Sequence, residues 1–130
     1  MKEITAQLNS YRQSPRKVRI VADAIRGKNV AEAKKKLQFI TKRAVSPLHK
    51  LLNSALANAK DLGVSAENLK IKSITVDGGK ILYRRRPVWH GMAHPIRKRT
   101  SHIKIVLAER KFKAPNPKSE TKDLNLKSKN

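Results

Sequence analysis

YRRRPVWHGMAHPIRKRTSHIK, residues 83–104, holds two triplets of Lys and Arg, the only Trp of the chain and three of its four His. The wider segment 78–108 contains eight bases and no acid. Ordinary charged surfaces mix both signs, so a run of one sign favours a polyanionic partner over a simply solvated face. Two interpretations remain for this stretch: a metal or catalytic site built from the histidines, or an arm that a negatively charged partner encloses.

Two strand-like segments flank this stretch, LKIKSITV at residues 69–76 and IKIVLA at residues 103–108. We expect them to pair as antiparallel strands. The apolar parity of the first changes around Ser73, which indicates a bulge or a strand covered on both faces. A third short strand is expected near the start of the chain, where Ile4, Ala6 and Leu8 alternate with polar residues.

The gap between the two paired strands predicts an unusual connection. About 26 residues separate them, whereas ordinary hairpin loops have roughly two to five. Residues 80–86 and 97–102 can continue the ladder outward, which leaves residues 87–96 as an irregular tip with Gly91 near its centre. We therefore expect an extended hairpin over residues 80–102. A two-stranded ribbon is marginally stable alone in water, so a partner is expected to enclose it.

Apolar side chains at helical spacing predict two helices in the first third of the chain. The first begins at Ser14-Pro15 and ends near Gly27, because Ser can cap a helix and Pro is tolerated in its first turn. The second begins at Asn29, and Glu32 three residues later resembles a capping box. Their apolar stripes are Val18, Val21, Ala22 and Ile25 in the first helix, and Val30, Ala33, Leu37 and Ile40 in the second.

A third and longer helix ends at Gly63, and its start has two possible positions. Thr41 can cap it, or Ser46-Pro47 can begin it; we expect the longer helix. Its apolar side is Ala44, Leu48, Leu51, Leu52, Ala55, Ala59 and Leu62. These elements predict an α+β fold, in which three helices pack on a small three-stranded antiparallel sheet with a long protruding β-hairpin. We expect one domain over residues 1–110 and a basic, polar C-terminal tail over residues 111–130.

Composition limits the classes of function. The chain has 130 residues, 31 Lys and Arg against 9 Asp and Glu, and no Cys. Its net charge of +22 favours a nucleic acid or another polyanion as partner. No apolar run approaches the roughly 18 residues of a membrane-spanning helix, and the start MKEITAQLNS has no apolar signal region. We therefore expect a cytoplasmic protein with no membrane partner and no small-molecule substrate.

The histidine cluster is a weak candidate for chemistry. His90 and His94 have the spacing of helical metal ligands, but Gly91 and Pro95 disfavour a helix there, and no carboxylate or Cys completes a shell. Ser101 and His102 are adjacent on a strand and point to opposite faces, so they do not form a nucleophile and base pair. We expect no catalytic residue, metal or cofactor, and a metal-dependent RNA hydrolase that uses the three histidines remains an alternative.

Nucleic acid is the favoured partner, and RNA is favoured over duplex DNA. Lys and Arg bind phosphates with release of counterions, and aromatic rings such as Tyr83, Trp89 and His90 stack on unpaired bases. A histone-like DNA compactor remains the alternative outside the enzyme class, although an aromatic tip has no evident use in one. The bases to which we assign phosphate contacts on charge alone are Arg19 and Arg26 on the first helix and Lys80 and Arg97 in the hairpin.

Three motifs resemble one known family. KRTSHIKIVLAER at residues 98–110, preceded by Gly91, Ala93 and Ile96 at the expected offsets, resembles the signature of the ribosomal large-subunit protein L-twenty-two family. SPRKVRIVADAIRGKNVAEA at residues 14–33 and LLNSALANA at residues 51–59 are similar to the same family. The resemblance covers about residues 5–110.

The resemblance implies a non-enzymatic component of the large ribosomal subunit, in a cytoplasmic ribosome or, as the alternative, an organellar one. The partners that it implies are large-subunit rRNA, neighbouring ribosomal proteins and the nascent polypeptide in the exit tunnel. It implies that the hairpin helps to line this tunnel, near where macrolide antibiotics bind. The tip VWHGMA departs from the family pattern, because Val88 and Met92 replace two expected arginines, and Trp89 or His90 can substitute by stacking. The residues to which it carries rRNA contact are Ser14, Pro15, Arg16, Lys17, Arg84, Arg85, Arg86, Gly91, Lys98, Arg99, Thr100, Ser101 and His102.

Overall fold

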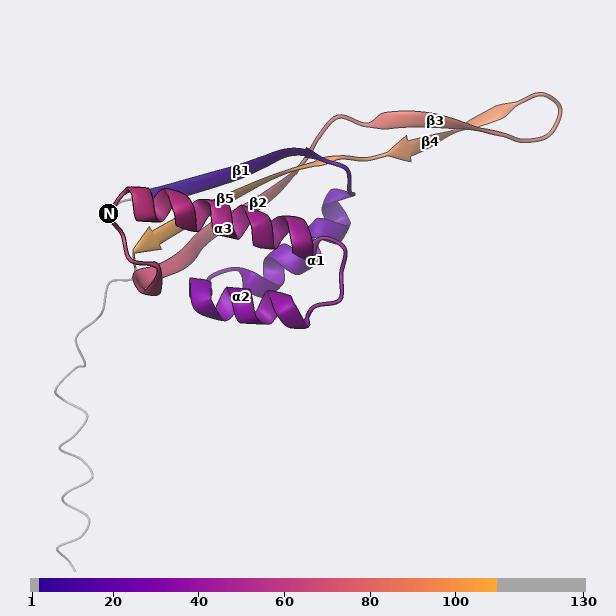
Figure 1. The fold of residues 1–130 in the computed structure, drawn as a ribbon. Helices are drawn as coiled ribbons and strands as arrows, with labels where there is room; N and C mark the ends of the chain where they lie inside the picture. The colour runs from indigo at the N-terminus through magenta and orange to yellow at the C-terminus, as the bar shows by residue number, and fades with distance from the viewer. Residues whose placement is uncertain (1–2, 110–130) are drawn as a thin grey trace, which may run out of the picture.

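The computed structural model describes residues 3–109, and the predicted tail over residues 111–130 lies outside this range (Figure 1). Within these residues the chain forms three α-helices and five strands, with a short 3-10 helix, η1, at Ala66–Asn68. The elements are β1 Glu3–Tyr11, α1 Pro15–Ile25, α2 Val30–Phe39, α3 Val45–Asp61, β2 Leu69–Gly78, β3 Leu82–Pro87, β4 Ala93–Lys98 and β5 Ser101–Glu109. The predicted α+β class is therefore confirmed.

Three of the strands form an antiparallel sheet in the order β1-β5-β2. β5, the last of the described strands, is thus the central one, and its pairing with β2 is the pairing predicted from sequence. The register of β2 against β5 shifts between Ile71 and Ser73, which confirms the predicted bulge. Because the bulge adds one residue, Ile71 and Ile74 are both buried although their numbers differ in parity.

The helices cover one face of this sheet, and the core lies between the two layers (Figure 1). The apolar stripes predicted for α1 and α2 are buried, apart from the partly buried Ile40, and so is that of α3, apart from the half-exposed Leu62. Gly27 and Gly63 follow α1 and α3 with φ of 71° and 73°, a left-handed conformation that glycine adopts without strain. We name this unit of three helices and three strands the body.

The predicted start of the third helix is wrong, and the side-chain caps expected from Ser14 and Asn29 are not formed, although α1 and α2 begin directly after these two residues as predicted. The third helix begins at Val45 and not at Thr41, so Pro47 occupies its third position, where a missing N–H removes no helical hydrogen bond. At the start of α2, Asn29 does not cap the backbone. Its Nδ2 instead donates to Oε1 of Glu32 at 3.2 Å, so the expected capping box is not formed.

β3 and β4 form a second, separate antiparallel sheet, which extends away from the body (Figure 1). We name it the ribbon, residues 82–98. The pairing runs from Leu82 with Lys98 to Pro87 with Ala93, so the irregular tip is shorter than the predicted residues 87–96. A hydrogen bond of 2.9 Å from the N–H of Val88 to the carbonyl of Met92 closes it.

Candidate nucleic-acid interface

The ladder does not run unbroken from the body into the ribbon, and a backbone and a side-chain hydrogen bond hold the junction between them, residues 79–81 and 99–100. The N–H of Gly79 donates to the carbonyl of Thr100 at 2.9 Å, and Thr100 Oγ1 donates to the carbonyl of Lys80 at 2.6 Å. A Cβ on Gly79 would lie 2.5 Å from Thr100 Oγ1 and 2.8 Å from His102 Nε2. Glycine is therefore required here by the close approach of two side chains.

The two residues that follow Thr100 tie the junction to the N-terminal part of the body. Ser101 is fully buried, and its Oγ donates to the carbonyl of Gln13 at 3.1 Å. His102 Nδ1 accepts from the N–H of Ser10 at 3.2 Å, where Ser10 has a positive φ of 55°. The motif TSH, which the family resemblance assigns to rRNA contact, thus has its side chains engaged inside the protein, where they fix the base of the ribbon.

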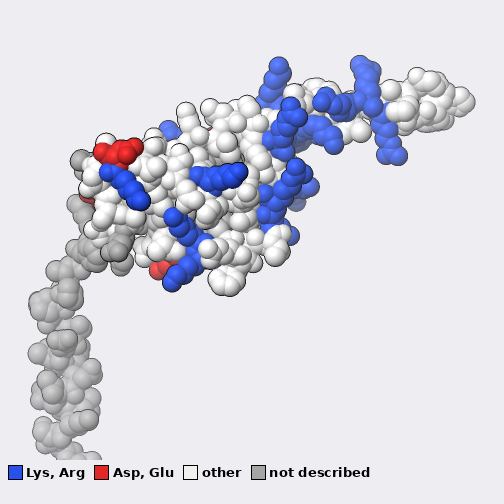
Figure 2. Space-filling view, in the orientation of Figure 1, with Lys and Arg blue, Asp and Glu red and all other residues white. Residues whose placement is uncertain are grey.

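A basic hollow lies where the body meets the ribbon. It brings together the start of α1, the α2–α3 connection and both ribbon strands, and we name it the junction hollow. Its lining residues are Arg12, Gln13, Ser14, Lys17, Arg43, Leu82, Arg84, Arg97, Lys98, Arg99 and Thr100. Seven of these eleven are Lys or Arg and none is acidic. Figure 2 shows Lys and Arg gathered over this part of the molecule and along the ribbon.

The structure unites predicted residues with others that sequence reasoning missed. Ser14 and Lys17 meet Arg84, Lys98 and Arg99 in the hollow. Arg12, Gln13, Arg43 and Leu82 were not predicted. Arg12 could have been predicted from its position, because it lies two residues before the predicted start of the first helix. Nothing in the sequence around Arg43 indicates that it belongs to this site. The Oε1 atom of Gln13 is buried without a hydrogen-bond partner.

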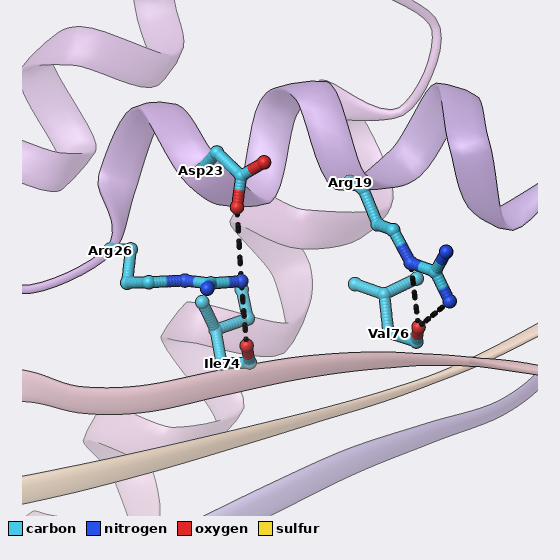
Figure 3. Close-up of polar contacts among 5 residues, drawn as sticks. All are labelled: Arg19, Asp23, Arg26, Ile74 and Val76. Carbon is cyan, nitrogen blue, oxygen red and sulfur yellow. Dashed lines mark hydrogen bonds and ion pairs between the residues drawn. The ribbon is translucent and has the colours of Figure 1, made fainter.

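Two predicted phosphate contacts, Arg19 on α1 and Arg26 directly after it, are engaged within the body (Figure 3). Arg19 donates from Nε and Nη2 to the carbonyl of Val76 at 3.1 and 2.9 Å. Arg26 donates from Nη2 to the carbonyl of Ile74 at 3.2 Å and pairs with Asp23 at 2.9 Å. β2 is an edge strand, so one side of its backbone has no neighbouring strand in the sheet. The two arginines donate to carbonyls of this strand.

The bases of the ribbon have a different environment. Every residue of β3 and β4 except Leu82 is exposed. Over residues 3–109 the ion pairs are Arg26 with Asp23 and Lys72 with Glu3, and neither involves the ribbon. At the tip, the rings of Trp89 and His90 lie 5.2 Å apart and are tilted by 55°. The positive charge of the ribbon is therefore available to a partner.

The described residues contain few features that indicate catalysis or metal binding. No group of three or more His, Cys, Asp or Glu within this part of the chain is arranged to hold a metal ion. Glu3 has a pKa below its ordinary value of 4.5, because Lys72 donates a hydrogen bond to its carboxylate and adds a favourable charge. This exposed pair lies on the body sheet and outside the junction hollow. None of the described helices is long and apolar enough to cross a membrane.

Comparison with known proteins gives one consistent result. Residues 6–108 match the family described as ribosomal protein L22p/L17e. A protein of Mesoplasma florum named large ribosomal subunit protein uL22 is 49% identical over 111 residues, which cover 85% of this chain and 99% of that protein. Proteins of the same name from Citrifermentans bemidjiense and Desulfitobacterium hafniense are 47% and 48% identical and cover 84% and 85% of this chain.

Proposed function

Because the chain belongs to the ribosomal protein L22p/L17e family, a structural and non-enzymatic family, we propose that it binds large-subunit rRNA through the junction hollow and the ribbon. Its relatives are named as proteins of the large ribosomal subunit, and this chain takes the corresponding place. In this role it supports subunit assembly, with rRNA and neighbouring ribosomal proteins as its partners.

The junction hollow is the observation that carries the proposal. Bases from three separate parts of the chain converge there without an acidic residue, although like charges repel one another in the free protein. Phosphate groups remove this repulsion, and each contact releases condensed counterions, which makes binding favourable and dependent on salt. The hollow therefore fits a bend of RNA backbone that touches the body and the ribbon together.

The ribbon supports the finer part of the proposal. With the junction it acts as one extended hairpin, and its exposure on both faces makes it marginal without an enclosing partner. Its tip, residues 88–92, carries no Lys or Arg, and Trp89 and His90 offer rings for stacking on unpaired bases. By resemblance to the family, the tip lines the polypeptide exit tunnel and faces the nascent polypeptide.

The proposed contacts separate into direct and supporting residues. Arg19, Arg26, Ser101 and His102 act indirectly, because their side chains hold the scaffold. The same holds for the side chain of Thr100. The direct rRNA contacts are Ser14, Pro15, Arg16, Lys17, Lys80, Arg84, Arg85, Arg86, Trp89, His90, Gly91, Arg97, Lys98 and Arg99, to which the hollow adds Arg12 and Arg43.

Sucrose-gradient sedimentation of cell extract tests the proposal. We expect the native protein to sediment with large subunits and to leave them in high salt. Its presence only in ribosome-free fractions would contradict the assignment. Competition between structured rRNA and duplex DNA for the purified protein tests the partner class, because a DNA compactor would prefer the duplex.

A further inference from the structure

The corner between α2 and α3 exposes an aromatic ring that the body does not use. We define the α2–α3 corner as residues 38–43. Phe39, the last residue of α2, is 83% exposed, more than any other large hydrophobic side chain in residues 3–109. Leu37, two residues earlier, is fully buried, so the helix end is firmly packed while Phe39 points outward. An aromatic ring left in water has most of its apolar surface available to a partner.

The chain neighbours of Phe39, Gln38 and Ile40, line a groove that is mainly apolar, and Phe39 itself lies outside the lining. Leu37, Ile40 and Val45 contribute its apolar side chains. Gln38, Thr41, Ser46 and His49 add groups that form hydrogen bonds. Such a mixture of a flat apolar surface and a few polar groups suits a nucleobase, which has two apolar faces and a hydrogen-bonding edge.

Charge favours a nucleic acid over a protein segment at this corner. Lys42, Arg43 and Lys50 line the groove, and Lys35 and Lys36 are exposed one helical turn before Phe39. The groove lining contains no acid. The one acid of α2, Glu32, lies two turns away and accepts a hydrogen bond from Asn29. An aromatic ring among cations fits a base joined to phosphates.

The corner is also continuous with the junction hollow. Arg43 lines both the groove and the hollow, and no other residue is shared between them. Arg43 therefore joins the two surfaces, and an RNA strand whose phosphates occupy the hollow can continue past Arg43 onto the corner. This continuity identifies the occupant as the same RNA that binds the hollow.

We propose that an unpaired nucleotide of large-subunit rRNA docks at the α2–α3 corner, with its base stacked on Phe39 and its phosphates on Lys42 and Arg43. The inference rests on the proposed function and adds to it a base-stacking site on the body, separate from the tip of the ribbon. Stacking tolerates any base, because every base has a π-face, so the site recognises an unstacked nucleotide and not a sequence.

Filter binding of the full chain to a large-subunit rRNA transcript tests the site. Phe39→Leu keeps apolar bulk and removes the π-face, whereas Phe39→Trp keeps the π-face. We expect Phe39→Leu and Phe39→Ala to weaken binding by about 5- to 150-fold with an unchanged salt slope, and Phe39→Trp to bind at least as tightly as the native chain. Ile20→Ala, at a residue that is 63% exposed on α1, is the matched control and should bind normally.

Three outcomes would overturn the site. Native affinity in all Phe39 variants excludes stacking, and affinity that only Phe39→Ala loses indicates an apolar contact without a base. Normal rRNA affinity combined with poor incorporation of Phe39→Ala into large subunits indicates a protein partner. In each case salt-dependent binding by the native chain keeps the proposed function standing, whereas a native chain that does not bind rRNA contradicts both.

Fluorescence gives an independent measurement. Trp89 is the only Trp, so Phe39→Trp combined with Trp89→Phe places one fluorophore at the corner. We expect quenching when the rRNA transcript is added, because a stacked base lies against the indole ring. An unquenched signal from a protein that has bound the transcript would exclude the stacked base.

Discussion

The body and the ribbon use the same residue type for opposite purposes. In the body, Arg19 and Arg26 bind carbonyl oxygens of the edge strand β2. In the ribbon, the arginines extend from two strands that bury almost nothing. The body is held together by a core that all three helices share with its sheet, whereas the ribbon depends on its backbone ladder and on the junction. Basic composition alone therefore does not reveal which arginines are free to bind a partner; their contacts with the neighbouring backbone do.

The comparison is tested most strongly by removing the charge of the ribbon. Changing residues 84–86 and 97–99 to Gln should weaken rRNA affinity by about 10³-fold near physiological salt and should reduce the salt slope by about 0.7 to 0.9 for each phosphate that the variant no longer binds. The melting temperature should hardly change, because these side chains are exposed. Titrations at several salt concentrations measure the slope, with Lys60→Gln plus Lys70→Gln as the control. A slope equal to that of the native chain would exclude phosphate contacts by the ribbon.

A large effect on stability is expected only in the body. Leu107 is fully buried in the central strand, so Leu107→Ala should lower the free energy of unfolding by about 2–5 kcal/mol. Ile96 in the ribbon is 39% exposed, and Ile96→Ala should change it by less than about 0.5 kcal/mol. Urea unfolding followed by circular dichroism measures both. Similar losses in the two variants would mean that the ribbon has a core of its own.

One added methyl group at the junction should lower both stability and rRNA affinity. Gly79→Ala places a Cβ against Thr100 and His102, so it should cost about 1–3 kcal/mol of stability and weaken rRNA binding by displacing the ribbon. Gly78→Ala is the matched control, because nothing lies within 4 Å of its Cβ. Equal behaviour of the two variants, in urea unfolding and filter binding, would show that the junction is loose.

A smaller effect is expected from an arginine that serves the body. Arg19→Gln removes a charged donor from the carbonyl of Val76, so stability should fall by about 1 kcal/mol. The salt slope of rRNA binding should stay as in the native chain, in contrast to the ribbon variant. A lower slope would instead assign Arg19 to a phosphate.

The smallest effect is a pH dependence in the body sheet. Because Lys72 lowers the pKa of Glu3 below 4.5, the stabilisation is fully present above that value and is lost as the pH falls through the lowered pKa. Lys72→Met should therefore lower the melting temperature slightly at about pH 6, and this difference should shrink as the pH falls below the ordinary value of 4.5. A difference that grows on acidification would contradict this sign.

Local patterns predicted the body well, because strand and helix periodicity follow from which side faces the core. The bulge near Ser73 was visible as a change of parity, and the pairing of β2 with β5 followed from two apolar runs. The predicted start of α3 was wrong. Proline is tolerated in the first turn of a helix, so Pro47 did not show at which residue the helix begins. Such positions depend on how the preceding connection packs.

The candidate site was predictable only in part, because its geometry depends on contacts between distant segments. Ser101 was assigned to rRNA from a motif, yet it is fully buried and bonded to Gln13, 88 positions away. Arg43 joins the hollow through the path of the α2–α3 connection, which no local pattern shows. The runs of positive charge predicted where the ribbon lies. Only the tertiary contacts show that the arginines of the ribbon are exposed, whereas Arg19 and Arg26 bind backbone carbonyls.

Because the ribbon is exposed on both faces, its length can change without loss of core packing. Each residue added to a strand extends it by about 3.3 Å, so one extra residue pair lengthens the reach of the tip by that amount. No side chain of the core must move, because the ribbon contributes none to it. Depth within a ribonucleoprotein can therefore change through insertions and deletions in the ribbon, while the body and its junction keep their sequence.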